Sequence, residues 1–325
     1  MSIVVVGSVA LDTVETPFGK ADNALGGAAV YFSTAASLYT QVQMVGVIGD
    51  DFPQRHVDFL QARGVDLRGL QRRAGQTFHW AGRYDYENLN NAQTLDTQLG
   101  LFATFDPQLP EDYRTAECVF LANIDPALQL KVLEQVRRPK LKVLDSMNFW
   151  ISSNKAALTE VIRKVDVVLM NESEALQYGE TFSLVTAARK ILELGPRVLL
   201  AKKGEYGAAL FADQTYFFAP AYPLEVVKDP TGAGDTFAGG FLGYLARAGD
   251  YSLSAMKRAV LHGSAMASFT IEDYSIDRLR TLTLADIEGR VSHFEHFTSV
   301  SGEPIFESLR LLGNPAPSRR GEGSN

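Results

Sequence analysis

The chain has very little cysteine and no long apolar run. Its single cysteine, Cys118, excludes an internal disulfide framework and any zinc site built from several cysteines. Because Cys118 lies in the apolar stretch 117–121, we expect a buried, unreactive thiol. No apolar run approaches the ~20 residues of a membrane span. No Lys or Arg precedes the short apolar run that ends at Gly7, which is typical of a core strand and not of a signal peptide. These absences predict a cytoplasmic protein that makes no membrane contact.

Positive charge is also in deficit. The 325 residues include 31 Lys and Arg against 38 Asp and Glu, which gives a net charge of −7. A chain this acidic is a poor general binder of nucleic acid, since phosphate backbones favour clustered Lys and Arg. An anionic substrate would have to be held by local positive groups, such as a helix N-terminus, a few Lys or Arg side chains, or a metal ion. The composition therefore favours a globular protein without a nucleic-acid partner.

Short β-branched runs alternate with longer helical patterns along most of the chain. This alternation is the signature of βαβ units, so we expect an α/β fold with a mostly parallel central sheet flanked by helices. The strands are expected at residues 3–6, 42–48, 118–121, 141–144, 167–170 and 198–201. The helices are expected at residues 27–39, 52–63, 127–136, 156–164 and 184–194. The repeated spacing predicts one wound domain, over residues 1–310.

Two segments break this rhythm. Residues 66–105 alternate polar and aromatic positions and contain turn-forming asparagines. They predict antiparallel strands that leave the main sheet, with residues 12–18 beside them. Residues 311–325 are rich in Gly, Pro, Ser and Arg, which predicts a disordered tail.

The best candidate for a functional site is the run KDPTGAGDTFAGGF at residues 228–241. An extended segment leads through this glycine-rich turn into a helix of small residues. Since glycine has no Cβ, backbone N–H groups would approach an anion there, and the helix N-terminus adds positive potential. Asp235, in the first turn, would accept the proton of a substrate hydroxyl that attacks phosphorus. The alternative is that Asp235 only caps the helix and the glycines only shape a turn.

The common nucleotide-binding motifs are missing. No G-x-x-x-x-G-K-[ST] run predicts a P-loop, and the first strand is followed by one glycine where a dinucleotide-binding turn needs three. An NAD-dependent oxidoreductase is therefore disfavoured. An early glycine pair, Gly26 and Gly27, would either admit a hydroxylated ligand against the backbone or only allow close helix packing.

Polar residues follow two of the later predicted strands, at the edge where α/β proteins bind ligands. Asn171 and Glu174 would hold water-bound magnesium there, or would only cap the next helix and complement its dipole. Lys202 opens the run KKGEYG, which would form either a nucleotide loop or an ordinary hairpin. The residues alone leave both alternatives open.

Four motifs occur in the order and at the separations of one known family. Gly26-Gly27, the Gly-Asp-Asp at 49–51, the Asn-x-x-Glu at 171–174 and the run 229–235 together resemble the ribokinase-like sugar kinases, also called the PfkB family. The Gly-Ala-Gly-Asp motif is the most specific part of this likeness. The resemblance implies a ribokinase-like fold with a small β lid, and ATP and Mg2+ as cofactors. It also implies transfer of the γ-phosphoryl group of ATP to a hydroxyl of a sugar.

The resemblance further implies roles for individual residues. By this likeness Asp235 is the catalytic base, and the backbone amides of Gly232, Ala233 and Gly234 form an anion hole for the transferred phosphoryl group. Asp12 grips substrate hydroxyls in a pocket that Gly26 and Gly27 also line. The nucleotide-binding positions are Asn171, Lys202, Gly204, Gly207 and Gly263. The metal positions are Glu174, for Mg2+ through water, and Asp229 and Thr231, for a monovalent cation such as K+.

The segments 12–18 and 66–105 match the family's lid, which closes over the substrate and in some members joins two subunits into a homodimer. Trp80 and Arg83 are candidate substrate contacts in this lid, or else cross-strand pairs that stabilise it. Tyr31 stands where the family usually carries Asn, so it is a further substrate-binding candidate and ordinary ribose is disfavoured. Nucleosides and polyols such as inositol therefore stay open as alternatives to a sugar. A non-catalytic metabolite sensor is the alternative of another class, although such a protein has no need of Asp235.

Overall fold

A nine-stranded sheet forms the centre of the computed structural model, which describes residues 1–85, 89–90 and 92–298. Its strand order is β13-β12-β11-β10-β9-β8-β1-β4-β5. Neighbouring strands from β5 to β11 run parallel, and β12 and β13 complete one edge as an antiparallel hairpin. The bounds are β1 (Ser2–Val6), β4 (Gln41–Ile48), β5 (Val65–Arg72), β8 (Cys118–Leu121), β9 (Leu141–Asp145), β10 (Val167–Asn171), β11 (Val198–Lys202), β12 (Ala208–Ala212) and β13 (Thr215–Ala219).

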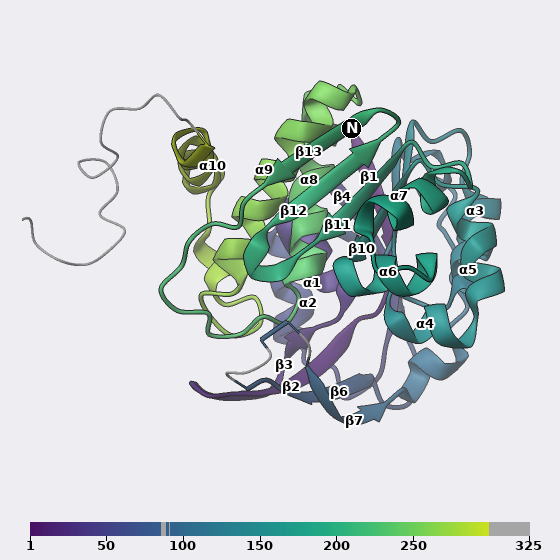
Figure 1. Cartoon of the computed structure of the whole chain (residues 1–325). Helices are drawn as coiled ribbons and strands as arrows, with labels where there is room; N and C mark the ends of the chain where they lie inside the picture. Colours follow the sequence, from purple (N-terminus) through teal and green to yellow (C-terminus); the bar gives the residue numbers. More distant parts are fainter. Residues whose placement is uncertain (86–88, 91, 299–325) are drawn as a thin grey trace, which may run out of the picture.

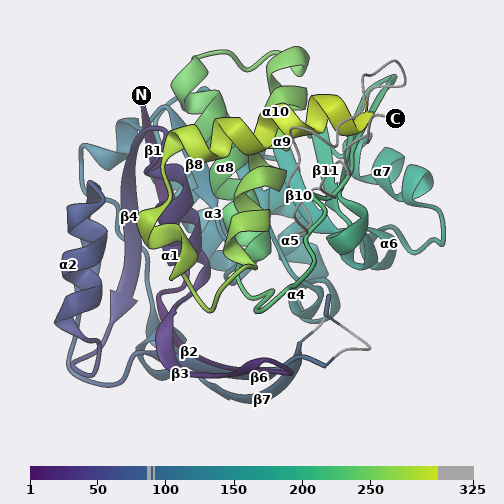
Figure 2. The same ribbon diagram turned by 90° about the vertical axis from the view of Figure 1, so that its left-hand side faces the viewer.

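Helices cover both faces of this sheet (Figures 1 and 2). One face carries α1 (Ala28–Ala36), α2 (Gln54–Ala62), α8 (Ala233–Ala248) and α9 (Leu253–Thr270), with α10 (Leu284–Thr298) packed on α9. The other face carries α3 (Pro126–Gln135), α5 (Lys155–Ile162), α6 (Glu172–Gly179) and α7 (Leu184–Leu192), with α4 (Asn148–Ser153) beside α5 and α6. Short 3-10 turns lie at η1 (Gly100–Thr104), η2 (Tyr113–Thr115), η3 (Gly204–Tyr206) and η4 (Arg278–Thr281).

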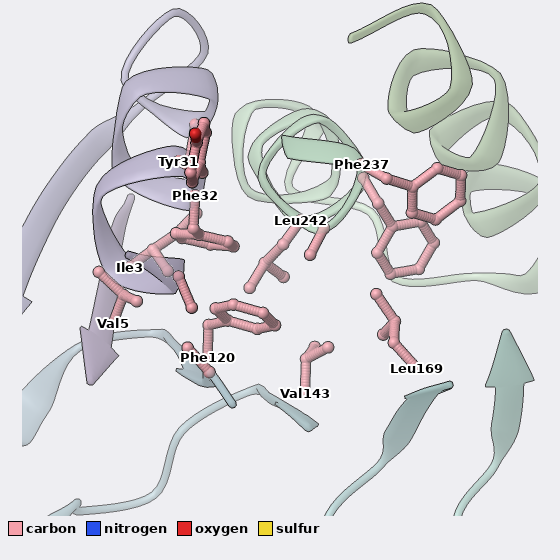
Figure 3. Packing of buried hydrophobic residues seen from close by; sticks show 14 of the residues in the cluster. Ile3, Val5, Tyr31, Phe32, Phe120, Val143, Leu169, Phe237 and Leu242 are labelled. Atoms are coloured by element: carbon pink, nitrogen blue, oxygen red, sulfur yellow. The ribbon is translucent and has the colours of Figure 1, made fainter. Parts of the chain in front are cut away.

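Two hydrophobic cores lie on the two faces of the sheet. Along β1, Ile3 and Val5 face the helices α1 and α8, whereas Val4 and Val6 face the opposite layer. Figure 3 shows the first core, where Phe32 of α1 stacks on Phe120 of β8 with ring centroids 4.1 Å apart. Because both faces are buried, the parallel strands inside the sheet are rich in apolar residues, and this is why the sequence predicted them, whereas the edge strand β5 is mixed in character.

A second sheet of four strands, in the order β3-β2-β6-β7, lies beyond the carboxyl ends of the parallel strands (Figure 2). Its strands are β2 (Ala10–Thr16), β3 (Gly19–Gly26), β6 (Phe78–Arg83) and β7 (Gln93–Gln98). The connection from β1 to β2 is only residues 7–9, so the first strand of the central sheet runs almost directly into the small sheet. This places the small sheet next to the edge where polar residues follow the strands.

The predicted α/β class is confirmed, and the predicted strands and helices are present with ends that differ by a few residues. The buried thiol is also confirmed: Cys118 is fully buried, and burial raises its pKa to about 11. Within the described ranges, no helix is long and apolar enough to cross a membrane. The tail predicted at 311–325 lies outside the described residues.

The prediction for the off-sheet strands was wrong at two places. Residues 65–72 form β5, which pairs in parallel with β4 at the edge of the central sheet. An edge strand exposes polar side chains, so β5 resembled a lid strand in its pattern. The third strand of the small sheet, β3, was missed because its Gly, Lys, Asp and Asn residues have low β propensity.

Candidate active site

Three adjacent parallel strands each end in a charged or polar residue, at the edge that faces the small sheet. Asp145 ends β9, Asn171 ends β10 and Lys202 ends β11. Lys202 Nζ donates to both carboxylate oxygens of Asp145, at 2.8 and 3.0 Å, across the end of the intervening strand. The carboxyl ends of parallel strands thus bring a buried ion pair to the place where ligands bind in this class of fold.

The glycine-rich turn meets this edge at the N-terminus of α8. Gly232 is the residue before the helix and has φ 75°, a left-handed conformation that favours glycine. A Cβ on Gly234 would lie 3.0 Å from Lys202 Nζ, so the ammonium group lies directly against the first turn of the helix. The first N–H groups of a helix have no intrahelical acceptor, although the Ala233 N–H donates a long bond of 3.3 Å to the Pro230 carbonyl. The turn offers backbone donors and one cation to an anion.

Asp235 lies in the first turn of α8 and is half-buried. Burial raises its pKa from 3.8 to about 7, the negative charge of Asp145 raises it further, and Lys202 lowers it. A carboxylate with a pKa near neutrality accepts a proton more readily than an ordinary surface aspartate does. The first turn therefore holds a potential general base beside a potential anion site.

Asp12 and the glycine pair form one buried unit. Asp12, on β2, is 5% exposed, and its carboxylate accepts the Gly27 N–H. A side chain at Gly26 would collide with this carboxylate. Gly27 has φ 95°, and a Cβ there would stand 2.5 Å from the Ser8 carbonyl oxygen. The glycines thus make room for Asp12 and for the return of β3 past the β1–β2 connection, while burial raises the pKa of Asp12 to about 7.

Tyr31 joins this unit to the turn. Its ring, on α1, packs directly on Gly232 and would collide with any Cβ there. Tyr31 is 2% exposed, and its hydroxyl finds no hydrogen-bond partner among the described residues. Burial raises its pKa, and the charges of Asp12, Asp229 and Asp235 raise it further, so the phenol stays neutral. It is an unpaired O–H donor in a neighbourhood of carboxylates.

The Asn-x-x-Glu motif forms a complete capping box at the start of α6. Asn171 Oδ1 accepts the Glu174 N–H at 2.8 Å, and Glu174 Oε2 accepts the Asn171 N–H at 2.7 Å. The carboxylate also accepts the backbone N–H of Asn148. Burial raises the pKa of Glu174 to about 7, Lys202 lowers it and Asp145 raises it. The structure thus contains the helix cap that the sequence offered as one alternative. The charges of Asp145 and Lys202 nevertheless act on the Glu174 carboxylate.

Asp229 links the glycine-rich turn to the loop after α9 through hydrogen bonds. It is 1% exposed, and its two oxygens accept the N–H groups of Thr231, at 2.9 Å, and Ser275, at 3.0 Å. The Thr231 hydroxyl donates to Tyr84 Oη, just beyond β6, at 3.4 Å. The segment just after β6 therefore contacts the glycine-rich turn.

The two predicted lid side chains lie on opposite faces of the small sheet. Trp80 pairs in register with Asp12, so both point to the same face, and its indole lies over Gly82. Arg83 points to the other face and forms an ion pair of 2.9 Å with Glu15 of β2. The structure brings Trp80 to the Asp12 side and leaves Arg83 as a cross-strand pair.

The remaining predicted glycines have local packing roles. Gly204, with φ 55°, lies against the Asn90 side chain, which bonds the Glu205 carboxylate. Gly207, with φ 101°, allows the β11–β12 hairpin to approach the end of β13. Gly263 lies buried where α9 crosses α8, and a Cβ there would stand 2.8 Å from the Phe237 carbonyl oxygen. Gly263 thus allows α8 and α9 to pack closely, and its place beside the nucleotide stays a prediction.

Sequence reasoning missed Asp145. It directly follows the predicted strand 141–144, and an acidic residue in that place is the same signal that identified Asn171 and Lys202. Its partner lies 57 residues later, so only the parallel register of β9, β10 and β11 reveals the pair.

Comparison with known proteins identifies the family. The family model described as pfkB family carbohydrate kinase matches residues 2–279. A cytidine kinase of Thermococcus kodakarensis is 31% identical over 248 residues, which are 74% of this chain and 87% of that protein.

Solved structures share the fold. The nucleoside kinase of Methanocaldococcus jannaschii superimposes with a TM-score of 0.72 at 22% identity, over 90% of this chain and 98% of that one. The E. coli protein named Ribokinase II, solved with ATP and Mg2+, gives a TM-score of 0.74 at 18% identity, over 90% and 99%. The chain belongs to the PfkB family of carbohydrate kinases, and it is an ATP-dependent phosphotransferase with an alcohol group as acceptor.

Proposed function

We propose that the chain transfers the γ-phosphoryl group of ATP to a hydroxyl of a nucleoside, with Asp235 as the general base. The observation that carries this proposal is the placement of Asp235 in the first turn of α8, beside Lys202 and opposite the buried Asp12–Tyr31 unit. A base, an anion site and a hydroxyl-binding carboxylate are the parts that phosphoryl transfer to an alcohol requires.

Each part has a distinct task in this mechanism. Asp12 accepts a hydrogen bond from a substrate hydroxyl, and the neutral Tyr31 phenol donates one to a substrate oxygen. Asp235 takes the proton of the attacking hydroxyl, and a pKa of about 7 lets it do so near neutral pH. The free amides of the first turn of α8 and the Lys202 ammonium stabilise the charge on the transferred phosphoryl oxygens.

A nucleoside is favoured over a free sugar by the comparisons, since the curated relative with 31% identity is a cytidine kinase. Trp80 points to the same face as Asp12 and offers an aromatic surface beside the carboxylate that would hold ribose hydroxyls. Such a surface stacks on a nucleobase but also packs against the apolar face of a sugar, so Trp80 fits both kinds of acceptor.

The residues present would bind Mg2+ only through water and through the phosphates of ATP. Within the residues that the structure describes, no group of three or more His, Cys, Asp or Glu side chains could hold a metal ion. The Glu174 carboxylate already accepts two backbone N–H groups. Mg2+ would therefore be bound chiefly by the phosphates of ATP, whose charge it neutralises, and Glu174 would reach it through water.

We also propose a monovalent cation beside Asp229 and Thr231. Burial raises the pKa of Asp229, so a cation there would offset the cost of keeping its carboxylate charged. K+ is then expected to raise turnover. Equal rates in K+ and in a large organic cation, at matched ionic strength, would rule this site out.

The test of the function is an ADP-release assay over a panel of acceptors. We expect cytidine or another nucleoside to stimulate ATP turnover more than ribose, fructose or inositol does. ATP turnover that no nucleoside stimulates, but that a free sugar or polyol does, would replace the nucleoside assignment. Turnover that no acceptor in an extended panel stimulates would remove the proposal.

A further inference from the structure

We propose that Asp145 is a positioning residue for phosphoryl transfer: it holds the Lys202 ammonium against the first turn of α8, where the polyphosphate of the nucleotide is bound. This inference rests on the proposed nucleotide site. It assigns a role to a residue that the sequence motifs do not mark.

The geometry gives Lys202 one fixed position. Its Nζ donates to Asp145 Oδ1 at 3.0 Å and to Oδ2 at 2.8 Å, and it lies where a Cβ on Gly234 would be 3.0 Å away. A lysine side chain has four rotatable bonds, so without the carboxylate the ammonium would be free to leave this position. The two bonds to Asp145 use two of the three N–H donors, and the third remains for an anion at the turn.

Burial argues that this pair is more than a stabilising contact. The Asp145 side chain is 5% exposed and that of Lys202 is 17% exposed. Removing two charges from water costs about as much as their attraction returns, so a buried ion pair is weak evidence of a purely stabilising role. Asp145 is further fixed by the N–H of Ser146, at 3.0 Å, so the carboxylate itself is held in place.

The electrostatics agree with the geometry. Among the neighbouring charges, Asp145 has the largest effect on the pKa of Asp235 and raises it, while Lys202 lowers it. The pair thus places a positive charge near the phosphates without fully removing the basicity of Asp235. Asp145 touches neither substrate nor reacting atoms in this scheme and acts through Lys202.

Nucleotide binding tests the proposal without any turnover. We would titrate the parent, Asp145→Asn and Lys202→Met with Mg2+ and either AMP or a non-hydrolysable ATP analogue. Both variants are expected to weaken binding of the analogue by about tenfold or more and to change AMP binding less than about threefold, because only the analogue carries β- and γ-phosphates. Asp166→Asn is the matched control: Asp166 precedes β10 at the opposite edge of the sheet, where its carboxylate accepts the Lys142 N–H.

The double variant tests whether Asp145 acts through Lys202. Asp145→Asn is expected to lower kcat roughly 10- to 100-fold with a small change in the KM of the nucleoside. Asp145→Asn combined with Lys202→Met should be no slower than Lys202→Met alone. Losses that multiply, or equal weakening of AMP and analogue, would overturn the positioning role. Absence of nucleotide binding by the parent would instead overturn the proposed function together with it.

Discussion

At the residue scale, burial changes the proton affinity of single carboxylates. Asp12, Glu174 and Asp235 each have a pKa raised to about 7, and in each case burial is the largest cause. Such groups oppose folding once they are charged, so their retention at one edge of the sheet points to a catalytic or binding use.

Asp235→Asn is expected to slow turnover by roughly 10²–10⁴-fold, because a neutral amide cannot accept the proton of the attacking hydroxyl. In the parent, turnover should fall as the pH drops below about 7, the value to which the pKa of Asp235 is raised. Because the pKa of Asp235 is higher in the folded state than in the unfolded state, binding of this proton stabilises the folded state at low pH. This contribution to the free energy of unfolding is lost as the pH rises towards 7.

The substitution should therefore raise the melting temperature at pH 8 and change it little at pH 4. Kinetics and thermal unfolding at both pH values check these two expectations. Turnover within about threefold of the parent, with an unchanged melting temperature, would contradict the role of a base.

Tyr31→Phe removes one buried oxygen and keeps the ring over Gly232. Since the hydroxyl has no partner among the described residues, its loss should leave stability unchanged or slightly higher. If the hydroxyl binds substrate, kcat/KM for the nucleoside should fall by about 5- to 100-fold, the effect of one lost hydrogen bond to a ligand. Steady-state kinetics and melting curves measure both. An unchanged kcat/KM would show that the phenol does not contact substrate.

At the element scale, one glycine turn joins the strand edge, α1 and α8. Gly232→Ala would force a side chain into the Tyr31 ring at a position with φ 75°. We expect both a lower melting temperature and a loss of turnover above about 10²-fold, because a shift of about 1 Å in catalytic groups costs that much. The matched control is Gly249→Ala, at the other end of α8. It also has a positive φ, 66°, but a Cβ there would meet only the flexible Met1 side chain.

Gly249→Ala should therefore lower the free energy of unfolding by about 1–2 kcal/mol, because of backbone strain, without a loss of turnover. Thermal unfolding and kinetics of the two variants separate the role of the Gly232 turn in the site from the general strain of a side chain at a positive-φ end of α8. Equal losses of turnover in both would contradict a specific role of the Gly232 turn.

The sequence predicted elements well where one physical signal dominates. Strands such as Val167–Asn171 are buried on both faces, so their apolar runs were plain. The small sheet was predicted with wrong limits because β3 and β7 are largely exposed, and exposed strands take their stability from their neighbours in space. The Asp145–Lys202 pair and the outward direction of Arg83 depend on register between distant strands, which no local pattern specifies.

At the scale of the whole molecule, the small sheet has two faces of different character. Its inner face carries Asp12 and Trp80, and Thr16 reaches Tyr274 of the main body with hydroxyl oxygens 2.9 Å apart. Its outer face carries the Glu15–Arg83 ion pair, in which both side chains are more than 40% exposed. Within the described residues, β3 and β7 are the edge strands of this sheet, and the backbone groups of an edge strand can pair with another chain. We therefore expect the inner face to select the substrate and the outer part to join two subunits.

Two substitutions separate these tasks. Trp80→Ala should raise the KM of the nucleoside and leave the molar mass of the particle unchanged, because the indole is on the Asp12 side. Arg83→Ala should leave the kinetic constants of the nucleoside unchanged and shift the protein from dimer towards monomer.

A contact built on such exposed charges should also weaken with salt, since the Debye length falls to about 3 Å at 1 M. Light scattering over a range of concentration and salt, with kinetics of both variants, gives the four results. A monomer at every concentration would remove the dimer, and an unchanged KM in Trp80→Ala would remove the selecting role of the inner face.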